Sequence, residues 1–187
     1  MSSSKKPAKQ SIKEKQREKL AKKEAFLRFK RQFLPLLLAV VLWITISTIL
    51  HLPAFRMQVQ DFFIRFTLNA AVGFGKLIFI PVESYAYPKI TVAGYTMEVV
   101  MECTAYNFYI FVICLSLLSP VKWTQRLITL GIFLSAIFVI NNFRFYTMGF
   151  IGNKYPDLFH DVHDYLWNIL FGFLVFLIWL WRYRDVK

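Results

Sequence analysis

Long apolar runs alternate with short polar segments along the chain. The first run, residues 33–50, carries no charged side chain and approaches the ~20 residues that a helix needs to cross a bilayer. Three further runs of similar character occupy residues 104–119, 127–143 and 165–181. The pattern therefore predicts an all-α polytopic membrane protein with about four transmembrane helices.

Residues 61–81 are also apolar, but polar side chains recur among them at near-helical spacing. These side chains are Asp61, Arg65, Asn69 and Lys76. A fifth crossing here would place the loop that carries Lys122 and Arg126 outside the cell, against the preference of basic loops for the cytoplasm. We therefore predict an amphipathic helix that lies in the outer membrane interface.

A short segment before the second predicted span alternates apolar and polar residues. This segment, residues 87–103, is rich in β-branched side chains and contains Ala93 and Gly94 at the predicted turn. The pattern predicts a short β-hairpin that leads directly into Cys103.

Composition agrees with a membrane protein, because 57% of the 187 residues are hydrophobic and 20 are Phe. The net charge of +12 is concentrated near the N-terminus. Twelve of the 23 Lys and Arg residues lie between Lys5 and Arg31, opposed by three Glu residues. We divide the chain into a basic cytoplasmic tail, 1–32, and a single integral membrane catalytic domain, 33–187.

A basic run of this density is compatible with nucleic-acid binding, but its position directly before an apolar span favours anionic lipid. We expect no nucleic-acid partner. Basic residues also follow the last span, in the sequence WRYRDVK. The charge pattern therefore predicts a multi-pass protein of the cell (inner) membrane with both termini in the cytoplasm.

This topology brings three reactive residue types to one outer face. Cys103 begins one predicted span, Arg144 follows the end of the next, and His163 precedes the last. A nucleophilic cysteine needs a base or a cation to form its thiolate, and donors to stabilise an oxyanion. We predict Cys103, Arg144 and His163 as catalytic residues of an outward-facing site.

Nearby polar residues are candidates for supporting roles. Asn141 precedes Arg144 by three residues and shares its helical face, and His160 has the same relation to His163, next to Asp164. Spacing alone does not decide which histidine is catalytic. The second cysteine, Cys114, lies eleven residues after Cys103, or ~16 Å along a helix, so the two cannot form a disulfide.

These features resemble the exosortase/archaeosortase family of membrane cysteine transpeptidases. The resemblance covers roughly residues 55–181 and rests on an ordered set of motifs: MEVVMECTAYNFY around Cys103, the N-x-x-R element from Asn141 to Arg144, and HDYLW from His163. Family members often have a Ser-Gly or Thr-Gly pair after the cysteine, where this chain has Thr104 and Ala105.

The resemblance implies an enzyme that cleaves membrane-anchored proteins near a C-terminal sorting tag and transfers them to an acceptor. Cys103 would form a thioester, His163 would act as base and then acid, and Arg144 would stabilise charge or hold substrate. We expect no metal and no other cofactor.

Two other function classes fit parts of the sequence. A metal-dependent membrane hydrolase would use His160, Asp161, His163 and Asp164, because imidazoles and carboxylates are suitable ligands. A non-enzymatic membrane scaffold would use the basic tail and the helices alone, and would leave Cys103, Arg144 and His163 without roles.

Overall fold

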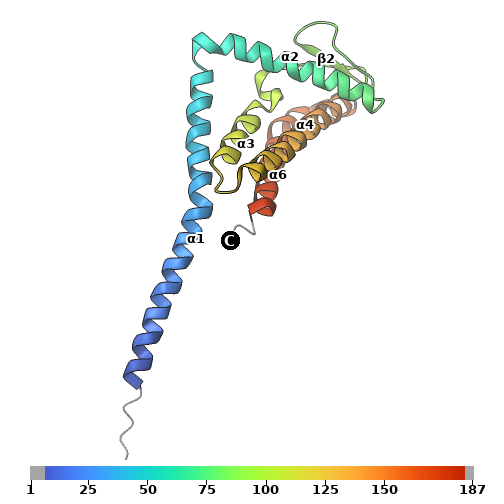
Figure 1. The fold of residues 1–187 in the computed structure, drawn as a ribbon. Helices are drawn as coiled ribbons and strands as arrows, with labels where there is room; N and C mark the ends of the chain where they lie inside the picture. Colours follow the sequence, from blue (N-terminus) through green and yellow to red (C-terminus); the bar gives the residue numbers. More distant parts are fainter. Residues whose placement is uncertain (1–6, 184–187) are drawn as a thin grey trace, which may run out of the picture.

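Helices dominate the computed structural model, which describes residues 7–183 (Figure 1). The five longer helices are α1 (Pro7–Leu50), α2 (Pro53–Leu77), α3 (Tyr106–Leu118), α4 (Trp123–Lys154) and α6 (Trp167–Tyr183). The short helical elements are η1 (Met101–Thr104), η2 (Pro156–Leu158), α5 (Phe159–Asp161) and the π-turn η3 (Val162–Leu166). Three strands complete the fold: β1 (Val82–Glu83), β2 (Lys89–Val92) and β3 (Tyr95–Glu98).

The longer helices form a bundle with one helix laid across its end. In Figure 1, α3 lies beside the second half of α1, α4 and α6 lie on the other side of α3, and α2 crosses the end of the bundle away from the N-terminus. The β-sheet lies near the C-terminal end of α2. The protein is thus a polytopic membrane protein of mainly helical architecture with a small sheet at one end.

Three helical segments are long and apolar enough to cross a membrane: Phe33–Leu50, Trp123–Lys154 and Pro156–Trp181. The span predicted at 104–119 is a shorter apolar helix, α3, whose 13 residues reach ~20 Å of a hydrocarbon core that is ~30 Å thick. It is short because the left-handed residue Ala105 precedes it and extended Ser119, before Pro120, ends it.

The span predicted at 127–143 is longer than expected. Helix α4 continues to Lys154, so Arg144 lies inside the helix rather than after its end. The prediction ended the span at Phe143, before the charged Arg144, but Arg144 is buried within the protein together with its polar neighbours Asn141 and Asn142. Polar side chains that face a protein interior do not stop a membrane helix.

Helix α2 has the amphipathic character predicted for 61–81, with different bounds. It begins at Pro53, a residue favoured in the first turn of a helix, and ends at Leu77. Its apolar face contributes Ile64, Leu68 and Ala71 to a buried cluster, whereas the Asp61 carboxylate pairs with Arg65 over 2.8 Å on the exposed face. Its place in a membrane interface stays a prediction.

The predicted hairpin is present as β2 and β3, and β1 adds a third strand that the sequence analysis missed. Ala93 and Gly94 form the turn with φ of 49° and 87°, the positive values that a two-residue hairpin turn requires. The Oγ1 atoms of Thr91 and Thr96 lie 2.8 Å apart across the two strands.

The sheet packs closely against α4 through glycine. A Cβ atom on Gly149 would lie 2.5 Å from Val92 Cβ, and one on Gly152 would lie 2.4 Å from the Tyr95 ring. Both distances are shorter than van der Waals contact allows. The two glycines therefore set how near the hairpin approaches α4.

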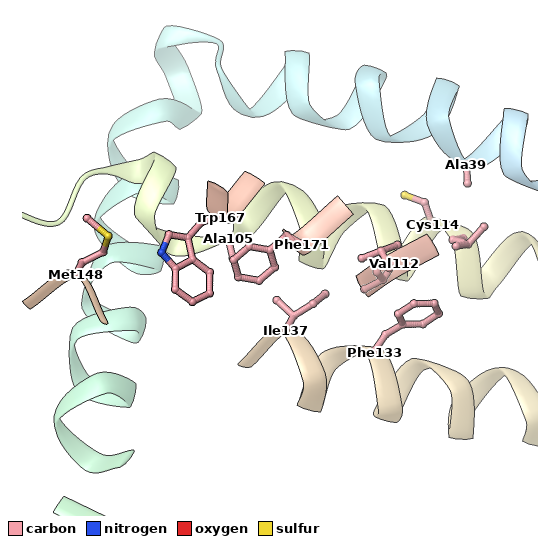
Figure 2. Close-up of a cluster of buried hydrophobic side chains, with 11 residues drawn as sticks. Ala39, Ala105, Val112, Cys114, Phe133, Ile137, Met148, Trp167 and Phe171 are labelled. Carbon is pink, nitrogen blue, oxygen red and sulfur yellow. The ribbon is translucent and has the colours of Figure 1, made fainter. Parts of the chain in front are cut away.

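The main core lies between α1, α3, α4 and α6 (Figure 2). Phe133 and Ile137 of α4 pack with Val112 of α3 and Phe171 of α6. Figure 2 shows Cys114 on the side of α3 that faces Ala39 of α1. Cys114 and Cys103 are both free thiols, as their separation predicts.

Helix α1 crosses the predicted boundary between tail and membrane domain without a break. The described side chains of its basic segment, among them Lys15, Lys19 and Lys22, are exposed, and Lys22 pairs with Glu18 over 2.6 Å. The first six residues of the predicted tail, and residues 184–187 of the basic C-terminal end, lie outside the described part of the chain. The division at residue 32 stays a prediction.

Candidate active site

Cys103 lies in η1, between the β-sheet and helix α3. Its side chain is 5% exposed and belongs to the buried cluster formed by α2, the sheet and α4. Its backbone N–H donates to Val100 O over 2.9 Å, and the Thr104 hydroxyl donates to Met101 O over 2.7 Å. These bonds fix the tight turn that presents the thiol.

Ala105 takes a backbone conformation that usually belongs to glycine. Its φ of 55° and ψ of 17° lie in the left-handed region, which costs a non-glycine residue ~1–2 kcal/mol. This conformation turns the chain from η1 into the axis of α3. Position 105 corresponds to the glycine of the Ser-Gly or Thr-Gly pair noted in the sequence analysis. In this chain the position is left-handed, and alanine occupies it.

His163 is the histidine that faces Cys103. Cys103 Sγ lies 3.3 Å from His163 Nε2, and His163 Nδ1 lies 2.6 Å from Asp164 Oδ1. The ring stacks on Phe159, with centroids 5.9 Å apart and planes 7° apart. The π-turn η3, which carries both His163 and Asp164, orients the ring toward the thiol.

The partners of the ring define its tautomer. The Asp164 carboxylate can only accept, so Nδ1 carries the proton and donates it. Nε2 then has a free lone pair that accepts from the Cys103 thiol. This neutral form is the one that a general base requires.

Arg144 shares the same ring nitrogen. Its Nη2 lies 2.9 Å from His163 Nε2 and 3.4 Å from His163 O, and its Nη1 lies 3.5 Å from Glu102 O. The side chain is 4% exposed. The guanidinium and the thiol therefore compete for one lone pair, and Arg144 holds a positive charge beside both.

The environment of the thiol has two opposing effects on its acidity. Burial raises the pKa of Cys103, and a backbone hydrogen bond from Val100 and then the positive charge of Arg144 lower it by smaller amounts, with a raised pKa as the net result. The resting cysteine is therefore a neutral thiol, which needs a base for activation.

A cavity of about 470 Å³ opens onto these groups. This volume falls in the range of small-ligand and peptide sites, ~300–1,000 Å³. Its walls come from β3, η1, α4 and the segment before α6. The lining residues are Tyr95, Thr96, Met97, Glu98, Val100, Cys103, Arg144, Phe145, Met148, Phe159, His160, His163 and Asp164.

The structure brings five of the six predicted site residues to this cavity, and only four of these five are connected to one another. Cys103, Arg144, His163 and Asp164 form one connected set, whereas His160 lines the same cavity. Asn141 is buried on α4 but is not among the lining residues, and its Oδ1 has no hydrogen-bond partner within residues 7–183.

His51, which the sequence analysis did not single out, supports the turn that carries Cys103. Its Nδ1–H donates to Ser47 O over 2.7 Å, and its Nε2 accepts from the Tyr106 hydroxyl over 3.2 Å. Tyr106 follows Cys103 by three residues. No local pattern signalled this contact, because it joins residues 55 positions apart.

The residues considered above as metal ligands do not converge. Across residues 7–183, no group of three or more His, Cys, Asp and Glu side chains is arranged to hold a metal ion. Asp161 is also absent from the residues that line the cavity. The metal-dependent alternative therefore lacks a ligand set in the described part of the chain.

Comparison with known proteins gives one match. The sequence model of the transmembrane exosortase family matches residues 23–181, which is most of the chain. The chain belongs to the transmembrane exosortase family. Comparisons with curated proteins and with solved structures returned no match.

Membership of the exosortase family agrees with the membrane architecture and with the resemblance drawn from the motifs. The matched region includes the span Phe33–Leu50, the sheet and all members of the Cys103, His163 and Arg144 set. The match begins at residue 23, so it covers only the last part of the basic segment that ends at Arg31.

Proposed function

We propose that this exosortase is a membrane cysteine peptidase and transpeptidase that acts on membrane-anchored proteins with C-terminal sorting tags. The observation that carries the proposal is the contact of Cys103 Sγ with His163 Nε2 at 3.3 Å, in a cavity that also contains Arg144. A thiol, an imidazole with an unprotonated nitrogen beside it and a cation are the parts that acyl transfer requires.

The first half-reaction forms a thioester. The Cys103 thiol gives its proton to His163 Nε2, and the thiolate attacks the carbonyl carbon of the scissile peptide bond. The resulting imidazolium is stabilised by the Asp164 carboxylate at Nδ1. When the tetrahedral intermediate collapses, the C–N bond breaks and His163 returns the proton to the leaving amine.

Arg144 has to change its hydrogen bond during this step. At rest its Nη2–H donates to the lone pair that receives the thiol proton, so protonation of Nε2 ends that bond. The freed N–H is then available to the thiolate or to the oxyanion beside it. Arg144 thus favours the charged states of the reaction over the resting state.

The second half-reaction releases the substrate. An acceptor nucleophile gives its proton to His163 and attacks the thioester carbon, and the C–S bond breaks. The Cys103 thiolate regains the proton from His163. An amine or hydroxyl acceptor completes transfer, whereas water completes hydrolysis.

The same proposal assigns the two ends of the bundle to the two sides of the cell (inner) membrane. The basic segment precedes Phe33, and the contact between His51 and Tyr106 holds the Cys103 turn at the other end of the span Phe33–Leu50. The 18 helical residues of this span place the basic segment and the Cys103 turn ~27 Å apart along the helix axis. With the basic segment on cytoplasmic anionic lipid, the site faces outward and meets substrates anchored in the outer leaflet.

The experiment that tests the proposal measures alkylation of Cys103 in intact cells with a membrane-impermeant thiol reagent, in a Cys114→Ser background. We expect labelling of the parent protein, and a rate at least ~10-fold lower in His163→Ala, because general-base catalysis contributes at least this much. His160→Ala is the matched control, since this residue lines the same cavity without contacting Cys103.

Equal rates in the parent and in His163→Ala would contradict the proposed base and favour the scaffold alternative. Labelling that occurs only after the cells are opened would contradict the outward orientation. A thioester intermediate provides a second check: proteins held on Cys103 should be released by neutral hydroxylamine and be absent from Cys103→Ser.

A further inference from the structure

Strand β3 forms the edge of the sheet that faces the active-site cavity. The strand order is β1-β2-β3, so β3 has only β2 as a neighbour. All four of its residues, Tyr95–Glu98, line the cavity. Successive side chains of a strand point to opposite faces, so a cavity lined by four consecutive residues meets the strand along its edge.

The register of the hairpin identifies the backbone groups on this edge. Val92 and Tyr95 flank a two-residue turn, and such a flanking pair exchanges both backbone hydrogen bonds. The next pair, Thr91 and Thr96, is then a non-hydrogen-bonded pair, in agreement with the close approach of its two hydroxyl groups. The backbone N–H and C=O of Thr96 and Glu98 therefore point away from β2.

These groups form a row that leads to the nucleophile. Within residues 7–183, no turn, loop or side-chain hydrogen bond involves the backbone of Thr96 or Glu98. Val100 extends the strand toward the nucleophile, with φ of −100° and ψ of 170°, and its own backbone bonds to Cys103: the carbonyl accepts the Cys103 N–H, and the N–H donates to the thiol. At ~3.3 Å per residue, the segment from Thr96 to Val100 spans ~13 Å.

We propose that the substrate polypeptide binds as an added strand along β3, and that backbone hydrogen bonds with Thr96 and Glu98 deliver the scissile carbonyl to Cys103. An exposed sheet edge is a template for an extended peptide. The inference rests on the proposed function and adds the mode of substrate recognition. It requires the segment around the scissile bond to be unfolded, with alternate backbone N–H groups available for pairing.

The test uses a tetra-alanine chloromethyl ketone and four analogues, each N-methylated at one residue, on the full-length protein in membranes with a Cys114→Ser background. In the reaction the Cys103 sulfur displaces chloride, and mass spectrometry measures the rate. An added strand pairs alternate residues, so methylation should slow alkylation ~10-fold at alternate positions and leave the others within twofold. Equal rates for all five compounds, or a uniform decrease, would overturn the proposal.

A backbone substitution in the protein provides the complementary measurement. Glu98→Pro removes the edge N–H at a position where proline is tolerated, whereas Glu98→Gln keeps it. We expect the ratio of the peptide rate to the iodoacetamide rate to be ~5–10-fold lower in Glu98→Pro than in Glu98→Gln. Equal ratios in the two variants would count against strand addition.

Iodoacetamide separates this inference from the proposed function, because the reagent has no peptide backbone to pair with β3. Its dependence on His163 tests the activated thiol. The alternation among N-methylated peptides tests the added strand. Each measurement can therefore be interpreted even when the other contradicts its prediction.

Discussion

The guanidinium of Arg144 donates a 2.9 Å hydrogen bond to His163 Nε2, the ring nitrogen that also faces the Cys103 thiol. This bond needs an unprotonated Nε2, so it breaks when that nitrogen accepts the thiol proton. It also holds the positive charge of Arg144 next to the site where the thiolate and the oxyanion form. The resting site is thus arranged so that proton transfer and the movement of Arg144 occur together.

Replacement of Arg144 should slow the chemistry and make the thiol less acidic. Arg144→Gln removes the charge that lowers the pKa of Cys103, so the pKa should rise further and alkylation at pH 7 should slow. We expect thioester formation to fall ~100-fold or more, as for the loss of an oxyanion donor. Arg126→Gln, in the first turn of the same helix, is the control, and equal effects of the two would contradict this role.

The raised pKa of Cys103 predicts the pH dependence of its reactivity. A thiol with a raised pKa holds its proton to higher pH, so the thiolate fraction at a given pH is smaller than for an exposed cysteine. The inflection of the alkylation rate should therefore lie at higher pH than that of Asp157→Cys, an exposed reference studied with both native cysteines replaced. An inflection below the reference would indicate a stable thiolate at rest.

A methyl group on Gly149 should separate the hairpin from α4. Because the added Cβ would lie 2.5 Å from Val92 Cβ, the sheet must move, and Gly149→Ala should destabilise the protein by ~1–3 kcal/mol. Thermal unfolding in detergent provides the measurement. The control Gly131→Ala lies on the same helix with no atom within 4 Å of the new Cβ, and we expect it to be neutral or slightly stabilising.

The left-handed conformation at Ala105 should restrict substitution there. Ala105→Val places a β-branched side chain at φ 55°, which should prevent the turn between η1 and α3 and abolish Cys103 labelling. Ala105→Gly removes the backbone cost but also a buried methyl, two effects of ~1 kcal/mol that nearly cancel. Ala136→Val, on regular helix α4, is the control for a larger side chain, and full labelling of Ala105→Val would refute the argument.

Much of the architecture follows from local patterns in the sequence. The charge-free run at 33–50 and the later apolar runs identify the membrane helices, because a bilayer requires long apolar segments. Ala93 and Gly94 identify the hairpin, because their turn needs positive φ. The order of Cys103, Arg144 and His163 along the chain also indicates one shared site, which the geometry supports.

Other features depend on contacts that no local pattern contains. Helix α4 extends past Arg144 because buried surroundings accommodate its polar residues, and the glycines at 149 and 152 matter only because the hairpin packs on them. The choice of His163 over His160 and the position of Asn141 outside the cavity depend on where each side chain points in the folded chain.

The sequence by itself determined that the chain is a membrane protein with a cysteine, an arginine and a histidine near the ends of separate helical runs, because hydrophobic length and residue type are local properties. The tertiary structure decided which histidine meets Cys103, which nitrogen of its ring faces the thiol, and which strand edge faces the nucleophile. Those properties depend on distances of a few ångströms between residues far apart in the chain, and only packing sets such distances.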